Sequence, residues 1–241
     1  MSGRAWRQLL VWLHVVSSVG WMSQAAALSV LLFTAIGGGS PSLRTGAAES
    51  AKILDTTVLV YSANVATATG LLLAVTTSWG FWLHRWVALK VVLTTGQLYL
   101  GIAVLSPRLD AAVAAVRAGG ADGVALLGFA GALMASAFAV QVWLSVAKPG
   151  GRTRRAARVR RPATAPAWLL ALAVVAPLAD TVLGITLTGP LPALSLLALV
   201  VALVVRRRRR SAGASEGRLR STRTSEGTPR RNGDRVVPAG R

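Results

Sequence analysis

The sequence contains no cysteine and only two histidines, His14 and His84. The absence of cysteine excludes disulfides, zinc–thiolate sites, iron–sulfur clusters and a cysteine nucleophile. Acidic residues are also scarce, with 8 Asp and Glu against 27 Lys and Arg, and charged residues make up only 15% of the chain. Soluble globular domains normally have about a quarter of their residues charged. The composition therefore excludes an ordinary soluble domain and leaves few side chains for metal or acid–base chemistry.

Basic residues are concentrated in two segments of the chain. Seven Lys and Arg fall within 148–161 and twelve within 206–241. The rest of the chain holds eight basic and five acidic residues, while apolar residues make up 53% of the whole sequence. A long, nearly neutral and apolar remainder is typical of a chain that crosses a membrane several times.

Apolar stretches long enough to cross a bilayer recur along the chain. A helix needs about 20 mainly apolar residues to span a ~30 Å hydrocarbon layer. The candidate stretches are 9–36, 54–77, 83–105, 124–147, 166–187 and a shorter one of 16 residues at 190–205. They predict an all-α polytopic transmembrane bundle of six helices. The predicted parts are a four-helix transmembrane core at 1–147, a basic cytoplasmic loop at 148–165, a transmembrane hairpin at 166–205 and a disordered basic cytoplasmic tail at 206–241.

The connectors between these stretches alternate between balanced and basic charge. Those at 37–53 and 106–123 are nearly balanced, whereas 148–161 and 206–210 are strongly basic. Short cytoplasmic connectors collect Lys and Arg, so six crossings place both termini in the cytoplasm and the protein in the plasma membrane. The expected partner is the lipid bilayer, with anionic head groups bound at 148–161 and 206–210.

The two ends of the chain carry further signals. The first apolar run is longer than the hydrophobic region of a signal peptide and favours an uncleaved anchor; cleavage after the alanines at 25–27 is the alternative. The tail has no aromatic residue between Arg206 and Arg241. It therefore lacks a stacking platform for single strands, and no nucleic-acid partner is expected.

Polar residues within the apolar stretches are candidates for function, because such groups are costly in hydrocarbon. Helical periodicity places several of them on shared faces. The candidates are His14, Ser17, Ser18 and Trp21 in the first helix, Tyr61 and Asn64 in the second, Lys90 and Gln97 in the third, and Asp180 in the fifth. The fourth helix instead offers Gly128 and Gly131 among alanines, a small-residue face for close helix contact.

The two histidines are predicted to lie at similar depth near the cytoplasmic ends of different helices. Two such imidazoles are the minimum for a bis-histidine haem site, and they also suit a proton relay. The alternative is structural: His14 bonds Ser18 or a backbone carbonyl, and His84 lies at the lipid–water interface between two tryptophans. Lys90, about 10 Å into its helix, either extends back to the cytoplasmic face or holds an anionic group such as a carboxylate.

Three motifs occur in order along the chain: HVVSSVGW at 14–21, WGFWLHRWVALK at 79–90 and SVAKPGGR at 145–152. Together they resemble a family of uncharacterised actinobacterial integral membrane proteins. More remotely, the spacing of His14 and Trp21, with a later intramembrane Lys, is similar to the HemJ-type membrane protoporphyrinogen oxidases and their DUF2269 relatives. That resemblance implies haem at His14 and an activity-related role for Lys90. Unlike in those oxidases, no Arg follows Trp21 in the first helix, so the resemblance implies haem binding rather than oxidase activity.

Three functions are compatible with the pattern. No nucleophile–base pair, carboxylate pair or glycine-rich phosphate loop is evident, so the first is a non-enzymatic membrane scaffold or accessory subunit. The second is a b-type haem protein in electron transfer or porphyrin oxidation, with His14 and His84 as ligands and Lys90 on a carboxylate. The third is a transporter for a small anion, guided by Lys90 and Gln97.

Overall fold

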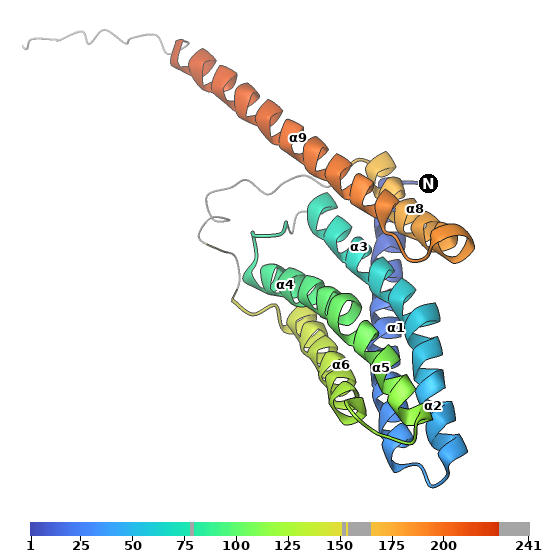
Figure 1. The fold of residues 1–241 in the computed structure, drawn as a ribbon. Coiled ribbons are helices and arrows are strands. Elements are labelled where there is room, and N and C mark those ends of the chain that lie inside the picture. The colour runs from blue at the N-terminus through green and yellow to red at the C-terminus, as the bar shows by residue number, and fades with distance from the viewer. Residues whose placement is uncertain (78–79, 151–152, 154–164, 227–241) are drawn as a thin grey trace, which may run out of the picture. The chain divides into compact units, whose positions relative to one another are not determined.

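The computed structural model describes residues 1–77, 80–150, 153 and 165–226, and this part of the chain contains helices and no β-strand (Figure 1). The helices are α1 (Gly3–Gly37), α2 (Pro41–Leu54), η1 (Asp55–Leu59), α3 (Val60–Thr76), α4 (Arg85–Leu100), η2 (Gly101–Leu105), α5 (Ser106–Arg117), α6 (Val124–Ala147), α8 (Ala167–Leu183), η3 (Gly184–Thr188) and α9 (Ala193–Glu226). Each η segment is a single π-helical turn that continues the helix before it. The predicted all-α fold is confirmed.

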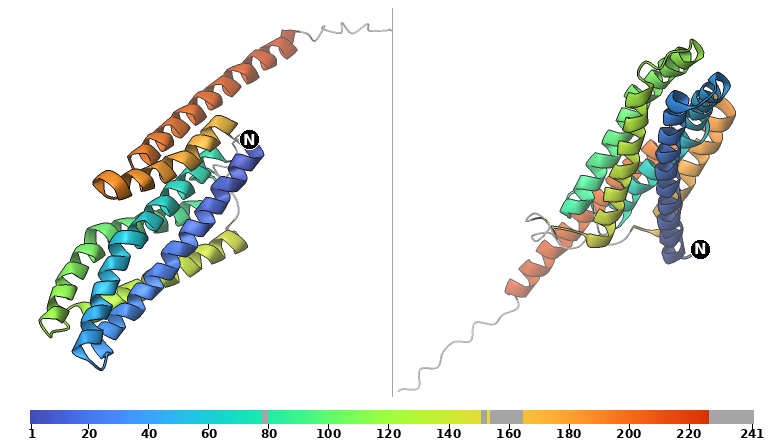
Figure 2. Two further views of the ribbon diagram at one scale, coloured as in Figure 1. Left: turned by 90° about the vertical axis from the view of Figure 1, so that its right-hand side faces the viewer. Right: turned by 90° about the horizontal axis from the view of Figure 1, so that it is seen from below.

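Residues Met1–Leu203 form one compact unit and Val204–Arg241 a second one. In the first unit, α1 is the central helix and packs against α2, α3, α6 and α8 (Figure 2). Among the described residues, five helices are long and apolar enough to cross a membrane: Gly3–Gly37, Pro41–Thr76, Arg85–Arg117, Val124–Ala147 and Ala167–Leu187. The chain is therefore a multi-pass membrane protein.

Three of these helices are much longer than a membrane span. Gly3–Gly37 has 35 residues, Pro41–Thr76 has 36 and Arg85–Arg117 has 33. At 1.5 Å per residue each extends about 50 Å or more, well beyond a ~30 Å hydrocarbon layer. The connectors predicted at 37–53 and 106–123 are therefore mostly helical, which corrects the expectation of loops there.

Local sequence explains the additional helix. Ser40 caps α2, because its Oγ accepts a hydrogen bond from Leu43 N at 3.2 Å, and Pro41 occupies the first helical position. α5 also carries a proline, Pro107, in its first turn. The charged side chains of α5 are exposed and those of α2 are half-buried, and a charge count alone does not distinguish such helices from loops.

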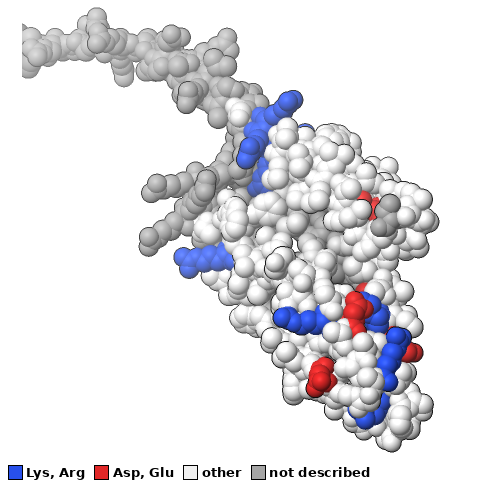
Figure 3. Space-filling view, in the orientation of Figure 1, with Lys and Arg blue, Asp and Glu red and all other residues white. Residues whose placement is uncertain are grey.

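The parts of the helices that exceed a membrane span pack together at the end of the bundle opposite the N-terminus. The apolar core of this extension consists of Leu32, Ala35, Ala47, Ala48, Ala51, Leu109, Ala112, Val113, Val116, Val124 and Leu127. Two ion pairs join α2 to α5: Lys52 Nζ lies 2.7 Å from Asp110 Oδ1, and Arg117 Nη2 lies 3.0 Å from Glu49 Oε1. Acidic and basic side chains are accordingly mixed on this surface (Figure 3).

The small-residue face of α6 is in close contact with α1. A Cβ atom at Gly131 would lie 3.1 Å from Ala25 O, and one at Gly128 would lie 3.1 Å from the Phe33 ring. Ser29 Oγ also donates to Gly128 O at 2.8 Å. Glycine at these positions allows the backbones to approach closely, as in other membrane helix pairs.

α8 begins beside the end of α3, where Ala165 N donates to Thr76 O at 2.9 Å. The predicted sixth span, 190–205, is helical from Ala193 onward. Its apolar part, 193–205, has only 13 residues, or about 20 Å of helix. It is therefore shorter than a ~30 Å hydrocarbon layer, and it is not one of the five helices counted above. A helix of this length crosses only where its flanking arginines extend to the head groups and the bilayer thins locally.

α9 continues through the basic segment as far as Glu226. Residues 206–226 of the tail that was expected to be disordered are thus helical in the structure. No proline occurs between Ala193 and Glu226, and arginine, alanine and leucine favour helix, whereas Gly213 and Gly217 do not. Residues 227–241 and most of the predicted basic loop at 148–165 lie outside the described residues.

Candidate functional site

His14 lies in the fourth turn of α1 and is held by α3. Its Nδ1 is 3.1 Å from Ala66 O and 3.1 Å from Thr69 Oγ1. A carbonyl oxygen can only accept a hydrogen bond, so Nδ1 carries the proton. In the neutral imidazole, Nε2 therefore keeps its lone pair. Within the described part of the chain, no group is hydrogen-bonded to Nε2.

Gly70 makes this position of the imidazole sterically feasible. A Cβ atom at Gly70 would lie only 2.9 Å from His14 Cε1. Contacts this short essentially never occur, so a larger residue would push the ring away from α3. The ring and its hydrogen bond to Ala66 thus depend on a glycine one turn further along α3.

Lys90 lies on α4 and points toward α6. Its Nζ donates to Ser145 Oγ at 2.6 Å, and Ser145 Oγ donates to Gln141 O at 3.0 Å. The ammonium is thus turned toward α6, near the end of that helix, and this contact decides neither of the two alternatives for the side chain. Lys90 is in neither of the ion pairs formed by the described residues.

Amide groups continue this polar contact deeper into the bundle. Thr94 Oγ1 donates to Gln141 Oε1 at 2.7 Å, Gln141 Nε2 donates to Gln97 Oε1, and Gln97 Nε2 donates to Met134 O at 3.1 Å. We call this chain of hydrogen bonds, from Lys90 to Met134, the α4–α6 ladder. It is the polar link between two otherwise apolar helices.

Two cavities adjoin His14 and Lys90. The mouth cavity, of about 300 Å³, is lined by Arg7, Val11, His14, Thr67, Gly70, Leu71, Leu73, Ala74, Thr77, Trp86, Val87, Lys90, Val91, Thr94, Ser145 and Lys148. The inner cavity, also about 300 Å³, is lined by His14, Val15, Ser18, Val19, Trp21, Met22, Ala66, Lys90, Thr94, Phe138, Gln141, Val142, Ser145 and Val146. His14 and Lys90 belong to both. Each volume lies at the lower end of the range for pockets that hold drug-sized ligands.

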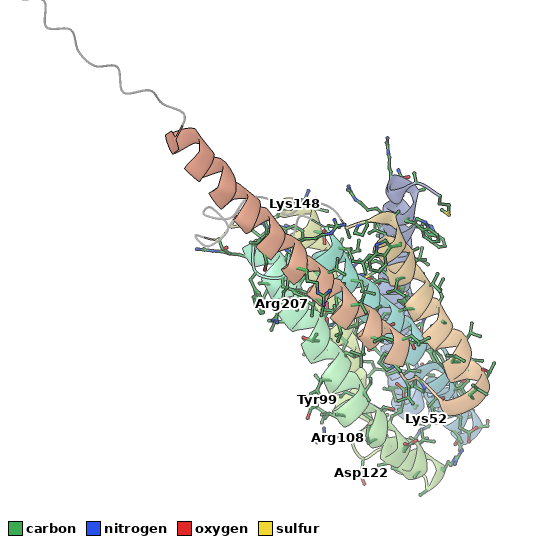
Figure 4. The ribbon with its side chains drawn as sticks, turned by 90° about the horizontal axis from the view of Figure 1, so that it is seen from above. Lys52, Tyr99, Arg108, Asp122, Lys148 and Arg207 are labelled. Carbon is green, nitrogen blue, oxygen red and sulfur yellow. The ribbon has the colours of Figure 1, made fainter. Side chains whose placement is uncertain are left out.

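The mouth cavity is cationic and mostly apolar. Arg7, Lys90 and Lys148 line it together with His14, and no carboxylate is among its lining residues in the described part of the chain. Lys148 ends α6, at the opposite end of the bundle from the charged residues of the extension (Figure 4). Thr67 Oγ1 is buried without a hydrogen-bond partner among the described residues. The cavity therefore combines positive charge with mostly apolar walls.

His84 is not placed with His14. It precedes α4, its ring centroid is 6.2 Å from that of Trp86, and it lines neither cavity. α1 begins at Gly3 rather than at the predicted residue 9, so His14 lies about 17 Å along its helix. The structure brings Lys90, rather than His84, to the same cavities as His14.

The other candidates in α1 have different surroundings. Ser17 is buried, and its Oγ donates to Leu13 O in its own helix at 2.8 Å. Ser18 lines the inner cavity. Trp21 is buried edge-on against Phe138, with ring centroids 4.6 Å apart, and forms part of the same wall. Only Ser18 and Trp21 thus join His14 at the cavities.

Three further candidates lie away from the two cavities. Tyr61 packs toward η3, where a Cβ atom at Gly184 would lie 3.0 Å from its ring. Asn64 is half-buried in α3 and lines neither cavity. Asp180 is buried and accepts hydrogen bonds from Leu194 N at 2.8 Å and Ser195 N at 2.7 Å. This carboxylate therefore caps the start of α9.

Sequence reasoning missed Gln141 and Arg7 as site residues. Gln141 is the single amide in the uncharged stretch 124–147, and buried amides commonly bond across membrane helices. That signal could have paired it with Gln97. Nothing in the sequence distinguishes Arg7 from the basic residues that commonly precede a first membrane helix.

Comparisons with protein-family models, with curated proteins and with solved structures each found no match. The description of the site therefore rests on its own geometry. On that geometry, the chain is an all-α, multi-pass membrane protein with a cationic cavity between α1, α3, α4 and α6.

Proposed function

We propose that the protein is a non-enzymatic integral membrane protein, such as an accessory subunit, that binds an amphipathic anion between α1, α3, α4 and α6. The observation that carries the proposal is Lys90, an ammonium without an ion-pair partner among the described residues, in a cavity with apolar walls. Lys90 is half-buried between apolar helices, and a cation in this position is stabilised when an anion neutralises it. An anion with an apolar body would neutralise the Lys90 charge and pack against the apolar walls of the cavity.

Two further features support a carboxylate-bearing ligand of some size. Arg7 and Lys148 line the same cavity as Lys90, so more than one acidic group can be accommodated. Thr67, whose buried hydroxyl has no hydrogen-bond partner among the described residues, also lines this cavity. A small hydrated anion would leave the apolar walls without contacts, which makes anion transport the less supported proposal.

The proposed location is the plasma membrane, with both termini in the cytoplasm. This placement requires the short apolar part of α9 to make a sixth crossing, with its arginines extending to the head groups and the bilayer locally thinned. The end of the bundle that holds the N-terminus carries Arg4 and Arg7, whereas the extension balances four basic residues against four acidic ones. Cytoplasmic surfaces of membrane proteins are enriched in Lys and Arg. In this arrangement the basic segments 148–161 and 206–210 contact anionic lipid head groups.

The proposal is tested with mesoporphyrin, a metal-free porphyrin dicarboxylate, added to the full chain in detergent. Binding is followed by quenching of tryptophan fluorescence, since Trp86 and Trp21 line the cavities. Lys90→Met preserves side-chain length but removes the charge. It should weaken binding at least tenfold, because a hydrogen bond to a charged group contributes about 1.5–3 kcal/mol.

The matched control is Lys52→Met, which removes a lysine paired with Asp110 in the extension. It should bind mesoporphyrin as the unchanged protein does. The dimethyl ester of mesoporphyrin, which lacks both charges, should bind at least tenfold more weakly. Equal binding by ester and acid, or by Lys90→Met and the unchanged protein, would exclude recognition of the anion by Lys90.

A b-type haem is a second candidate, favoured by the orientation of His14. Histidines that ligate metals usually donate their other ring N–H to a carbonyl or carboxylate, as His14 Nδ1 does to Ala66 O. The residues fit one axial ligand, His14 Nε2, and Lys90 fits a propionate. Haem would supply one-electron chemistry at the iron. A second histidine ligand is not provided at the cavities, since His84 lines neither of them.

A further inference from the structure

Asp55 is a carboxylate with spare hydrogen-bonding capacity at the far side of the membrane-spanning bundle. It lies 21 residues before Thr76 in one continuous helix, about 32 Å from the end of α3. That distance matches the thickness of the hydrocarbon layer. Ser106 Oγ donates to Asp55 Oδ2 at 2.6 Å. The Asp55 carboxylate takes part in no second hydrogen bond and in no ion pair within the described part of the chain.

Two basic residues of the extension are already paired with other carboxylates. Lys52, one turn before Asp55, forms its ion pair with Asp110, and Arg117 forms one with Glu49. The Asp55 carboxylate is half-buried and is thus left without a cation of its own. An anion in this position is stabilised when a cation binds beside it.

A third cavity, which we call the far cavity, adjoins Asp55. Its volume is about 270 Å³, and Asp55, Thr56 and Ser106 form its polar wall. Trp21, Leu98 and other apolar residues form the rest, and no Lys, Arg or His is among its lining residues in the described part of the chain. The far cavity therefore has the opposite charge to the mouth cavity.

Two π-helical turns shape this cavity. Asp55 begins η1, and Ser106 directly follows η2, so the two π turns lie next to each other where the hydrogen bond joins them. A Cβ atom at Gly101, the first residue of η2, would meet no atom within 4 Å. Single π turns inside helices are frequent at functional sites. Here they leave open space beside the carboxylate.

We propose that the far cavity binds an organic ammonium ion with an apolar substituent. The Asp55 carboxylate neutralises the ammonium, and the apolar wall takes the substituent. The Trp21 indole forms part of that wall, and a cation near an indole gains further electrostatic attraction. A metal ion is disfavoured, because no group of three or more His, Cys, Asp or Glu suited to a metal occurs among the described residues.

The test is titration calorimetry with benzyltrimethylammonium and the full chain in dodecyl maltoside, which is uncharged. Saturable binding is expected. Asp55→Asn, which keeps the shape but removes the charge, should weaken it at least tenfold. Gly101→Leu should weaken it similarly by filling the cavity without changing any charge. Asp122→Asn, an exposed carboxylate outside the cavity, is the matched control and should bind normally.

The source of the ammonium is resolved by adding lipid. Phosphatidylcholine that competes with benzyltrimethylammonium identifies a lipid head group as the ligand, and no competition identifies a free organic cation. Circular-dichroism melting shows that each variant is folded. The proposal is overturned if the folded Asp55→Asn protein binds within threefold of the unchanged protein, or if the unchanged protein shows no saturable binding at millimolar concentration. These outcomes are independent of the mouth cavity and of Lys90.

Discussion

His14 is oriented by hydrogen bonds that its own helix cannot provide. Ala66 and Thr69 on α3 bind its Nδ1, and Gly70 leaves room for the ring. Lys90 is likewise directed by Ser145, which lies 55 residues away in sequence. Both residues could be identified as candidates from the sequence, because polar side chains are energetically costly in hydrocarbon. Their hydrogen-bond partners could not be identified in this way.

The haem candidate gives a prediction for His14. The detergent-purified protein, expressed with adequate haem supply, should show a sharp Soret band in its reduced-minus-oxidised spectrum. His14→Ala should lose the band, because His14 is the one histidine among the described residues that line the two cavities. The measurement is the visible difference spectrum per mole of folded protein.

A rescue experiment separates ligation from folding. His14→Gly leaves a space beside Gly70, and added imidazole should restore the Soret band in this variant. His84→Ala should keep the band, since His84 lines neither cavity. A colourless unchanged protein, or an unaltered spectrum in folded His14→Ala, would rule out haem ligation by His14.

At the scale of elements, α4 is the most weakly buried of the helices around the cavities. Only Val87 and Gln97 are buried in it, whereas nine residues of α3 are. The α4–α6 ladder is therefore an important part of what holds α4 in place. Amides without hydrogen bonds are costly in hydrocarbon. The hydrogen bond between Gln97 and Gln141 therefore stabilises the contact between α4 and α6.

Breaking the ladder should destabilise the protein measurably. Gln97→Leu leaves the Gln141 amide without its partner, and we expect a loss of about 1–2 kcal/mol in the free energy of unfolding. Adding Gln141→Leu should recover part of the loss, since both amides are then gone. Unfolding by sodium dodecyl sulfate in mixed micelles, followed by circular dichroism, measures the difference.

Gln24→Leu is the matched control for this cycle. Gln24 Nε2 donates to Ser62 Oγ at 3.2 Å, but its Oε1 is buried without a partner among the described residues. Its replacement should change stability by less than about 0.5 kcal/mol, because one modest bond is lost together with one unsatisfied atom. A Gln97→Leu effect no larger than this would show that the ladder does not hold α4.

The boundaries of the elements were the least predictable part of the fold. The apolar stretches indicated the spans, but the charged residues of α2 and α5 resembled loops until their partners were known. Lys52 and Glu49 are separated from Asp110 and Arg117 by about 60 residues, and the ion pairs form only once the two helices are side by side. The Ser40–Pro41 start of α2 was a readable local signal.

At the scale of the whole molecule, the first unit has two chemically different ends. The N-terminal end opens into the cationic mouth cavity, and the extension carries balanced charge on a small helical core. The balance of the extension suits the outer side of a membrane, and the basic end suits the cytoplasm.

The absence of cysteine makes this orientation directly testable. Ser42→Cys places one thiol on the exposed start of α2 in the extension, and Ser2→Cys places one at the exposed N-terminal end. A membrane-impermeant maleimide should label Ser42→Cys in intact cells and Ser2→Cys only after permeabilisation. The unsubstituted chain should not be labelled. The reverse pattern would invert the proposed topology.

The sequence by itself determined that the chain crosses a membrane several times as helices. The length of an apolar stretch and the charge beside it are local properties, and they decide whether that stretch partitions into the bilayer. Tertiary structure alone decided that His14 meets Lys90 rather than His84, and that Asp55 meets Ser106 beside an open cavity. These pairings depend on where each helix begins, on π turns that shift its faces, and on contacts between residues far apart in sequence. Periodicity along one helix carries no information about the rotation or depth of its neighbour.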